Sequence, residues 1–375
     1  MRERSPVRRR RSRRPPARDR PSNPLRSCHE RNVGAVQHPR EPATDSGRTV
    51  GEVGERALIK LFTHAADQRS GPGIDDPDVV IGSGDDAAVL RGRGAVVVST
   101  DTAVAGRHFR FDWSEPEQIG ARAVVQSAAD VAAMGGVLDG IVVSLGCPPQ
   151  TSVARLLALN EGLVEQTHRL GGRVLGGDLV SSPTVILTVT SLGSLAGVEP
   201  VTLSGARPGD VLAVSGPLGA AAAGLAVLSA IEYGADNALA QRFSSLVAAY
   251  RLPQPDLSQG PRAARAGAHA MTDVSDGLVE EIITVADASG LAVDVVSATV
   301  PRAPQLDECA AELGVDPIRW ALTGGEDHQL LGAFAPADVP DGWTEIGTCR
   351  AGGTGATVDG AAASGLHGWQ SFSET

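Results

Sequence analysis

The chain has 375 residues, a formal net charge of −11 and four cysteines, and only 3% of its residues are aromatic. This length exceeds one ordinary domain and predicts two domains of roughly 150 to 170 residues, each large enough to bury a core. The cysteines lack Cys-x-x-Cys spacing, which argues against a disulfide framework or a zinc site and favours reduced thiols in the cytoplasm. Since no run of about 18 apolar residues occurs, we expect no membrane-spanning helix.

Residues 1–40 differ in composition from the remainder of the chain. They contain 13 arginines against Glu3, Asp19 and Glu30; because the whole chain carries −11 and this segment +10, the remainder carries −21. With almost no apolar periodicity, the segment cannot bury enough surface to fold, and we expect residues 1–49 to be a disordered extension outside the chemistry. Only this basic arm has the composition to bind nucleic acid, so we expect no nucleic-acid partner for the rest. It lacks the apolar stretch of a secretion signal.

Residues 50–203 have the pattern of a layered α/β domain. Apolar residues at helical spacing predict a first helix over 53–62, followed by a loop broken by Pro and Gly. Short apolar runs predict strands over 79–81, 95–99, 140–145, 173–176 and 184–196. Helices are expected between them, over 115–134 and 152–170. Strands separated by helices are typical of a layered α/β fold.

A segment containing Pro and Gly, residues 203–210, predicts the link to a second α/β domain over 204–375. A strand over 211–215 begins it, followed by an alanine-rich helix from Ala220 and another helix over 240–250. Pro253 and Pro255 end that helix, because proline cannot continue the backbone hydrogen bonds. A short strand over 269–273 then leads into a helix over 278–288.

Acidic residues beside glycine or other small residues recur along both predicted domains. The clusters are Gly82-Ser83-Gly84-Asp85-Asp86, Ser99-Thr100-Asp101, Ala129-Asp130, Gly176-Gly177-Asp178, Asp273-Val274-Ser275-Asp276-Gly277 and Gly324-Gly325-Glu326-Asp327. Strand ends are where open α/β sheets build their sites. Carboxylates are the ligands that Mg²⁺ prefers, and glycine lets the backbone approach a bulky anion. One such segment is most simply a solvated turn, but their repetition predicts convergence on a polyphosphate and several Mg²⁺ ions.

Lys60 is the only lysine in the chain, and it lies on the first predicted helix. The sequence therefore excludes a P-loop kinase, whose motif requires a lysine, and a protein kinase, which requires a strand lysine. If the protein handles phosphate groups, it must do so with Mg²⁺, arginine and backbone N–H groups.

The chain from about Gly51 to its C-terminus resembles the thiamine-monophosphate kinase family, in the superfamily of aminoimidazole ribonucleotide synthetase and selenophosphate synthetase. Besides the acidic clusters, the residues that carry the resemblance are Thr102, Gly106-Arg107-His108-Phe109, Val131-Ala132-Ala133-Met134-Gly135, Ser204-Gly205-Ala206-Arg207-Pro208-Gly209-Asp210, Leu278 and Gly368-Trp369. They occur in the family's order over about 320 residues. The His-Phe pair and the late tryptophan separate this family from its relatives.

The resemblance implies ATP-dependent phosphorylation of thiamine monophosphate to thiamine diphosphate. It implies a homodimer in which the amino-terminal domains, which bind ATP and Mg²⁺, form a central barrel beside a carboxy-terminal α/β domain. The implied metal ligands are Asp86, Ser99, Thr100, Asp101, Asp130, Asp178, Asp273 and Asp276, with Asp86, Asp130 and Asp276 as catalytic residues. Gly177, Asp178 and Ser275 match ATP contacts, and His108, Glu326 and Trp369 match contacts to the thiamine substrate.

The proposed acceptor explains why the site is rich in Asp. A phosphate monoester has a second pKa near 6, so its oxygen is largely ionised at neutral pH and needs no general base. Repulsion between the acceptor and the ATP phosphates is the obstacle, which Mg²⁺ ions offset during in-line transfer. Simpler interpretations remain for single residues: His108 alone suits a core or surface position, and Trp369 could seal the second domain.

One position departs from the family pattern. Leu203 stands where the family usually carries an arginine that contacts ATP, and Arg207 is a possible substitute. The loss of a charged hydrogen bond weakens binding by roughly 1.5 to 3 kcal/mol. This leaves two alternatives open: a nucleotide-binding homologue without turnover, and a synthetase of the same superfamily that acts on another substrate.

Overall fold

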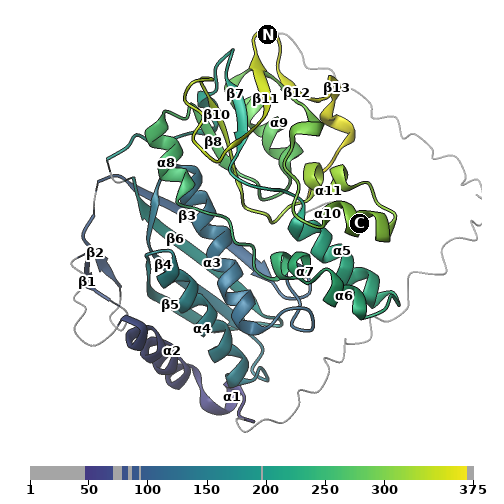
Figure 1. The fold of residues 1–375 in the computed structure, drawn as a ribbon. Coiled ribbons are helices and arrows are strands. Elements are labelled where there is room, and N and C mark those ends of the chain that lie inside the picture. The colour runs from purple at the N-terminus through teal and green to yellow at the C-terminus, as the bar shows by residue number, and fades with distance from the viewer. Residues whose placement is uncertain (1–46, 71–77, 83–86, 93, 196, 370–375) are drawn as a thin grey trace, which may run out of the picture. The chain divides into compact units, whose positions relative to one another are not determined.

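The computed structural model describes residues 47–70, 78–82, 87–92, 94–195 and 197–369. These residues form two sheets with helices packed against them, as Figure 1 shows. The mixed α/β class with two sheet-containing parts is confirmed. Residues 1–46 of the predicted extension lie outside the described residues. The domain boundary between residues 203 and 204 stays a prediction.

The amino-terminal part is built on a four-stranded sheet in the order β3-β6-β4-β5. Its strands are β3 (Val96–Val104), β4 (Val137–Cys147), β5 (Arg173–Ser181) and β6 (Ile186–Ser194). Helices α3 (Pro116–Ala133) and α4 (Val153–Arg169) pack against each other on the sheet. They come so close that a Cβ on Gly162 would lie 1.9 Å from the Glu117 carbonyl oxygen, so this position requires glycine. Helices α1 (Val50–Val53) and α2 (Glu55–Ser70) and the small hairpin β1 (Val79–Ile81) and β2 (Val89–Leu90) precede the sheet.

Four elements in this part differ from the sequence prediction at their boundaries. The strands predicted over 140–145 and 173–176 are longer, as β4 (Val137–Cys147) and β5 (Arg173–Ser181). The strand predicted over 95–99 continues through Asp101 to Val104, because all nine residues of β3 pair with β6 and its Thr and Val residues suit a strand. The helix predicted over 53–62 is divided near Gly54 into α1 and α2, and α2 continues to Ser70, since no helix-breaking residue occurs before Gly71 and Pro72.

The carboxy-terminal part is built on a seven-stranded sheet in the order β13-β12-β9-β11-β7-β10-β8. Its strands are β7 (Val211–Val214), β8 (Ala270–Asp273), β9 (Ala292–Val295), β10 (Leu330–Phe334), β11 (Thr344–Arg350), β12 (Gly355–Val358) and β13 (Ala361–Ala362). All neighbours pair antiparallel except β9 and β12. The antiparallel pairing makes this part an α+β arrangement.

Seven α-helices and three short 3₁₀ turns accompany this sheet in the described residues. The α-helices are α5 (Ala220–Glu232), α6 (Ala238–Arg242), α7 (Ser244–Arg251), α8 (Gln259–Ala266), α9 (Leu278–Ser289), α10 (Leu306–Leu313) and α11 (Pro317–Thr323). The turns are η1 (Leu203–Gly205), η2 (Ser297–Thr299) and η3 (Ala363–Gly365). The helix predicted over 240–250 is two helices, because the backbone leaves the helical conformation at the buried Phe243.

Helix α3 joins the two parts. Its last residues, Ala132 and Ala133, share a buried cluster with Met271 of β8 and Phe334 of β10. A helix that starts over the first sheet and ends against the second can carry side chains to the boundary between them, and α3 carries Arg122 and Asp130.

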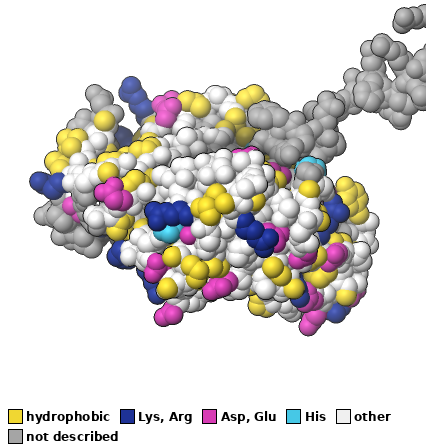
Figure 2. Space-filling model, turned by 90° about the horizontal axis from the view of Figure 1, so that it is seen from above, with side chains coloured by type: hydrophobic (Ala, Val, Ile, Leu, Met, Phe, Trp, Pro, Cys, Tyr) yellow, Lys and Arg dark blue, Asp and Glu magenta, His cyan; other side chains and the backbone are white. Residues whose placement is uncertain are grey.

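The described surface carries charges of both signs. Figure 2 shows Lys and Arg side chains interspersed with Asp and Glu over the face that it draws. On this face, the described residues therefore present no broad area of a single charge. Within the described ranges, no helix combines the length and apolarity needed to cross a bilayer.

Candidate active site

The first group of predicted site residues lies where β3 faces α3. Side chains alternate along a strand, so Ser99 and Asp101 are partly buried on the helix side, whereas Thr100 is exposed on the other face. The Ser99 hydroxyl donates a hydrogen bond to Asp130 Oδ2 on α3. Thr100 Oγ1 lies 3.0 Å from Thr190 Oγ1 on the neighbouring strand. The structure brings Ser99, Asp101 and Asp130 together and turns the Thr100 side chain away from them.

The second group comes from the other sheet. Asp273 ends β8 and is buried, and Asp276 is exposed in the loop before α9. Gly277 follows with φ of 120°, a conformation that favours glycine and turns the chain into the helix. Ser275 in this loop donates from Oγ to Glu281 Oε1 at 3.3 Å.

The two groups are close enough to influence one another's ionisation. Burial, with Asp273 as the next cause, raises the pKa of Asp101 and raises that of Asp130 to about 7. Although the Asp276 residue is exposed to solvent, the protein around its carboxyl partly desolvates it, and this desolvation, followed by the charges of Glu326 and Asp273, raises its pKa. Each carboxylate is thus held near others of the same charge. An added cation would relieve this repulsion.

The donor set fits a hard divalent cation such as Mg²⁺. Asp101 Oδ2 is buried and has no hydrogen-bond partner among the described residues, although a buried carboxylate oxygen normally has one. Carboxylate and hydroxyl oxygens are the ligands that Mg²⁺ prefers. No three Asp, Glu, His or Cys side chains in the described ranges form a ready-made metal site by themselves. Asp86, predicted to be a ligand, lies outside the described residues.

His328 links the acidic group to Glu326 and was not singled out from the sequence. Its Nδ1 lies 2.9 Å from Asp273 Oδ2, and its Nε2 lies 3.5 Å from Glu326 Oε2. Burial opposes the imidazolium, but the hydrogen bond to Asp273 and the negative charges of Asp273 and Glu326 outweigh it and raise the pKa of His328 to about 10. The signal in the sequence was its place directly after the Gly-Gly-Glu-Asp cluster.

A cavity of about 500 Å³ brings together His108, Glu326 and Trp369, which the sequence assigned to the thiamine substrate. The rings of His108 and Trp369 meet edge to face with their centres 6.4 Å apart. The backbone N–H of Trp369 donates to the Asp276 carbonyl at 2.9 Å, so the tryptophan lies beside the acidic group. The volume is in the range of small-molecule sites.

The charges in this cavity are fixed by their neighbours. Burial lowers the pKa of His108, and Nδ1 accepts a hydrogen bond from the Val104 N–H at 3.1 Å, so the ring is neutral at pH 7. Burial opposes ionisation of Glu326, but Arg122 and then His328 outweigh it and lower its pKa to about 2. The cavity thus presents an ionised carboxylate beside a neutral imidazole.

Asp327, next to Glu326, has a structural role. Its carboxylate accepts hydrogen bonds from the N–H groups of Gly219 at 2.5 Å and Ala221 at 3.0 Å, at the start of α5. A carboxylate at a helix N-terminus satisfies unpaired N–H groups and interacts favourably with the helix dipole. Burial nevertheless raises the pKa of Asp327 to about 6.

Gly177 and Asp178 lie apart from the other site residues. Strand register pairs Asp178 with Ser144, Ser144 with Thr188, and Thr188 with Thr102 of β3. Three strand spacings of about 4.8 Å place Asp178 roughly 14 Å from the strand that carries Asp101. A Cβ on Gly177 would lie 2.2 Å from the Val143 carbonyl oxygen, so close strand packing explains this glycine.

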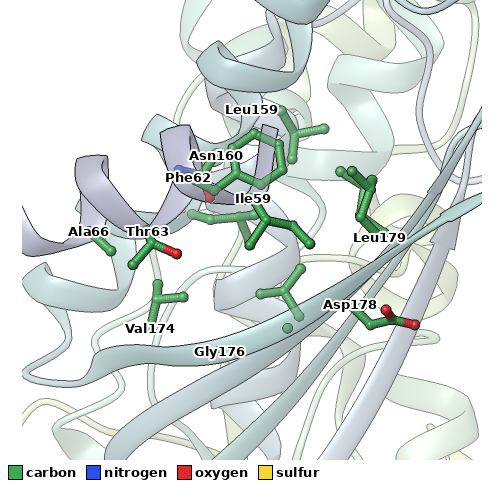
Figure 3. Close-up of a pocket in the computed structure, with 14 residues that line it drawn as sticks. Ile59, Phe62, Thr63, Ala66, Leu159, Asn160, Val174, Gly176, Asp178 and Leu179 are labelled. Carbon is green, nitrogen blue, oxygen red and sulfur yellow. The ribbon is translucent and has the colours of Figure 1, made fainter. Parts of the chain in front are cut away.

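A small, mainly apolar pocket lies beside Gly177, between α2, α4 and the sheet. Figure 3 shows Ile59 and Phe62 of α2 near Leu159, Val174 and Gly176, with Asp178 at one side. Asn160 of α4 lines the same pocket, is buried, and its Nδ2 has no hydrogen-bond partner among the described residues.

Comparisons with known proteins agree with this geometry. Residues 84–195 match the family model described as AIR synthase related protein, N-terminal domain, and residues 207–325 match the corresponding C-terminal domain. Thiamine-monophosphate kinase of Mycobacterium tuberculosis (strain ATCC 25618 / H37Rv) is 41% identical over 335 residues, 88% of this chain and 95% of the relative. The Corynebacterium glutamicum enzyme of that name is 39% identical over 332 residues, 87% of this chain and 96% of the relative.

Solved structures of thiamine-monophosphate kinases are also similar to this chain. A structure described as AaThiL complexed with AMPPCP and TMP superposes with a TM-score of 0.69 at 29% identity, covering 86% of this chain and 98% of that one. Thiamine-monophosphate kinase from Stenotrophomonas maltophilia K279a has a TM-score of 0.70 at 28% identity, with 81% and 96% coverage. The hydrogenase maturation protein HypE, at 17% identity and a TM-score of 0.60, shares the fold.

Proposed function

Because the chain belongs to the thiamine-monophosphate kinase family, we propose that it transfers the γ-phosphoryl group of ATP to thiamine monophosphate, giving thiamine diphosphate and ADP. The observation that carries the proposal is the cavity of about 500 Å³ lined by His108, Glu326 and Trp369, whose lining also includes Asp276 of the acidic group. A cationic ring and its phosphate would thereby meet different surfaces of one site.

The substrate end of the cavity suits a cationic aromatic ring. Glu326 is ionised at neutral pH and faces the cavity, so it favours a permanently charged thiazolium. His108 is neutral and adds no repulsion to that cation. Trp369 is 45% exposed and offers an aromatic surface to the ring.

The phosphate end needs charge compensation. The acceptor oxygen of thiamine monophosphate is already largely ionised at neutral pH, so no side chain has to remove a proton from it. Residues that would hold Mg²⁺ are Asp101, Asp130, Asp273 and Asp276 with Ser99, joined by the predicted ligands Asp86 and Asp178. The Thr100 side chain faces away from this group, so we do not propose it as a side-chain ligand. Bound Mg²⁺ would supply the positive charge that lets two anions approach. The chain's own carboxylates then fix where the two phosphate groups meet.

We further propose that two copies of the chain complete each site. The four-stranded sheet exposes Val96, Val98, Val142 and Val180 at 58%, 61%, 38% and 49%, so an apolar strip lies open to a partner. Two such sheets face to face would close a barrel. Asp178 and Gly177 lie on the strand at the edge opposite β3, from which a second copy would bring them to the acidic group. In this arrangement, the pocket beside Gly177 suits the base of ATP.

The direct experiment is incubation of the purified full chain with ATP, Mg²⁺ and thiamine monophosphate, followed by chromatography for thiamine diphosphate. Parallel reactions with thiamine and with aminoimidazole precursors separate this kinase from other members of the superfamily. Thiamine diphosphate in the first reaction alone is the expected result. Product in none of the reactions, despite measurable ATP binding, would identify a nucleotide-binding homologue.

Replacing Trp369 by Ala is expected to raise the KM for thiamine monophosphate while changing that for ATP by less than about twofold. A cation over an indole contributes roughly 0.5 to 2 kcal/mol, which corresponds to about 2- to 30-fold in binding. Tyr233→Ala, which removes an 89% exposed aromatic ring at the end of α5, is the matched control. Steady-state kinetics check both variants, and an equal rise of both KM values would show that Trp369 serves packing.

Replacing Leu203 by Arg tests the departure from the family pattern. Leu203 lies in η1 and is 36% exposed, so an arginine there can be solvated and can reach an anion. We expect ATP to bind more tightly by about 10-fold or more, as for one charged hydrogen bond, with the KM for thiamine monophosphate unchanged. Val296→Arg adds the same charge at another exposed position and controls for long-range attraction. Calorimetric titration with ATP measures both; unchanged or weaker binding in Leu203→Arg would mean that other groups already hold the phosphates.

A further inference from the structure

Arg122 is a buried cation on α3 that the mechanism above does not use. Its side chain is 6% exposed, and its neighbours in sequence on this helix are small and apolar. Nη1 donates to the Tyr250 carbonyl oxygen at 3.2 Å, and the guanidinium lies over the Tyr250 ring at 5.1 Å. Burying a guanidinium is costly unless its donors are paired, so this position has a specific role.

The partner of Arg122 is the cavity-facing carboxylate of Glu326, and the polar contacts that the described residues make with this carboxylate reach one of its two oxygens. Oε2 lies 2.7 Å from Nη2 and 3.2 Å from Nε of Arg122. Gln126 Nε2, one helical turn along α3, donates to Oε2 at 3.2 Å, and His328 Nε2 lies 3.5 Å from it. Oε1 accepts no hydrogen bond from the described residues.

The backbone conformation of Glu326 also indicates that its surroundings fix the position of this residue. Its φ is 69°, in the left-handed region, which is uncommon for a residue with a side chain. Such a conformation persists where the surroundings determine it. The Glu326 N–H donates to the Ser275 carbonyl at 2.7 Å, which fixes the main chain, while Arg122 and Gln126 fix the carboxylate.

We propose that Arg122 is a positioning residue for substrate recognition: by holding Oε2 of Glu326 from the α3 side, it leaves Oε1 directed to the cationic, amino-bearing heterocycle of the substrate. The proposal rests on the proposed function. It adds a residue that links α3, the helix that carries Asp130, to the Glu326 carboxylate that would contact the substrate. A carboxylate has acceptor sites on both oxygens, so an anchor on one leaves the other for a ligand.

The geometry of the anchor matters more than its charge. Arg122 and Glu326 carry opposite charges, so the pair attracts a cation less than a lone carboxylate would. Recognition must then depend on where Oε1 points. Lysine at position 122 would keep the charge, but its single ammonium cannot reproduce a planar fork that reaches Glu326 and Tyr250 together. The Lys variant should therefore recover only part of the function.

The test is the kinetics of Arg122→Met and Arg122→Lys in the purified full chain with ATP, Mg²⁺ and thiamine monophosphate. Loss of the charged hydrogen bonds predicts a KM for thiamine monophosphate about 10-fold or more above native in Arg122→Met, and an intermediate value in Arg122→Lys. The KM for ATP should stay within about twofold. Arg242→Met controls for the loss of an arginine ion pair as such, because it breaks an equally short 2.7 Å pair with Glu312 on the exposed surface outside the cavity.

A cycle with Glu326→Gln shows whether Arg122 acts through this carboxylate. If it does, Arg122→Met/Glu326→Gln should bind thiamine monophosphate no more weakly than Glu326→Gln alone, since the second change has nothing left to position. If the two single changes instead multiply their effects on the KM for thiamine monophosphate in the double variant, Arg122 acts through a group other than Glu326. Should Arg122→Met fail to fold, Gln126→Leu removes a neutral donor from the same oxygen and should raise the KM for thiamine monophosphate by about threefold.

The outcomes separate this inference from the proposed function. Native chain that forms no thiamine diphosphate would overturn the proposed function. Native turnover together with an unchanged KM for thiamine monophosphate in folded Arg122→Met, or in Gln126→Leu, would overturn the inference alone. A similar rise in both KM values, matched by Arg242→Met, would assign Arg122 to stability.

Discussion

Asp130→Asn is expected to lower turnover by a factor of about 1,000 or more while the protein stays folded, because removal of one metal-binding charge weakens charge compensation in the transition state. Asparagine keeps the shape of the side chain, and its amide oxygen can still accept a hydrogen bond from the Ser99 hydroxyl. Asp287→Asn removes an exposed carboxylate on α9 and should leave turnover at the native level. Chromatographic measurement of thiamine diphosphate checks both. Near-native turnover in folded Asp130→Asn would refute the role of this carboxylate.

The same variant has an expected effect on stability in the absence of Mg²⁺. The pKa of Asp130 rises on folding from 3.8 to about 7, so the carboxylate destabilises the fold progressively as pH rises from about 4 to about 7. Asn carries no such charge. At pH 7, Asp130→Asn should therefore unfold at a higher temperature than the native protein, with a free energy of unfolding larger by a few kcal/mol. This advantage should vanish below about pH 4. Calorimetry at the two pH values measures it.

Local sequence patterns were enough to predict most elements and part of the site. The predictions for α3, α4 and β6 agree with the structure to within about two residues at each end, because their apolar periodicity is long and their flanks are polar. The sequence placed Asp101 at the end of a strand and Asp130 on a helix, and the small residues beside each carboxylate marked both as site residues. The side-chain direction of Thr100 followed from strand alternation only once β3 was known to continue past it.

Other features depend on tertiary structure that a pattern does not contain. Arg122 looks like a solvent-exposed helix residue until α3 is known to pass between the two sheets. Asp178 shares the Gly-Gly-Asp motif of a site residue, but the order β3-β6-β4-β5 separates it from Asp101 by two intervening strands. Strand order depends on how the connections cross the sheet, so sequence proximity to glycine could not reveal this separation.

That separation leads to the second prediction, which concerns Asp178→Asn. Asp178 is exposed on β5, roughly 14 Å from the strand of Asp101 in the same chain by three spacings of about 4.8 Å. If it binds metal in the same site as Asp130, the two carboxylates must come from different copies. Asp178→Asn alone should then be nearly inactive, with a loss approaching that of Asp130→Asn.

Mixing the two inactive variants should restore activity. In a dimer of one Asp130→Asn chain and one Asp178→Asn chain, one site carries both changes and the other carries neither. Random pairing of equal amounts makes half of the dimers mixed, so co-expression should recover about a quarter of native turnover. Asp130→Asn with Asp101→Asn is the control, because both residues belong to the same half of a site and no intact site can form. Differently tagged chains show that mixed dimers are present. If they are present without recovered turnover, Asp178 does not complete the partner's site.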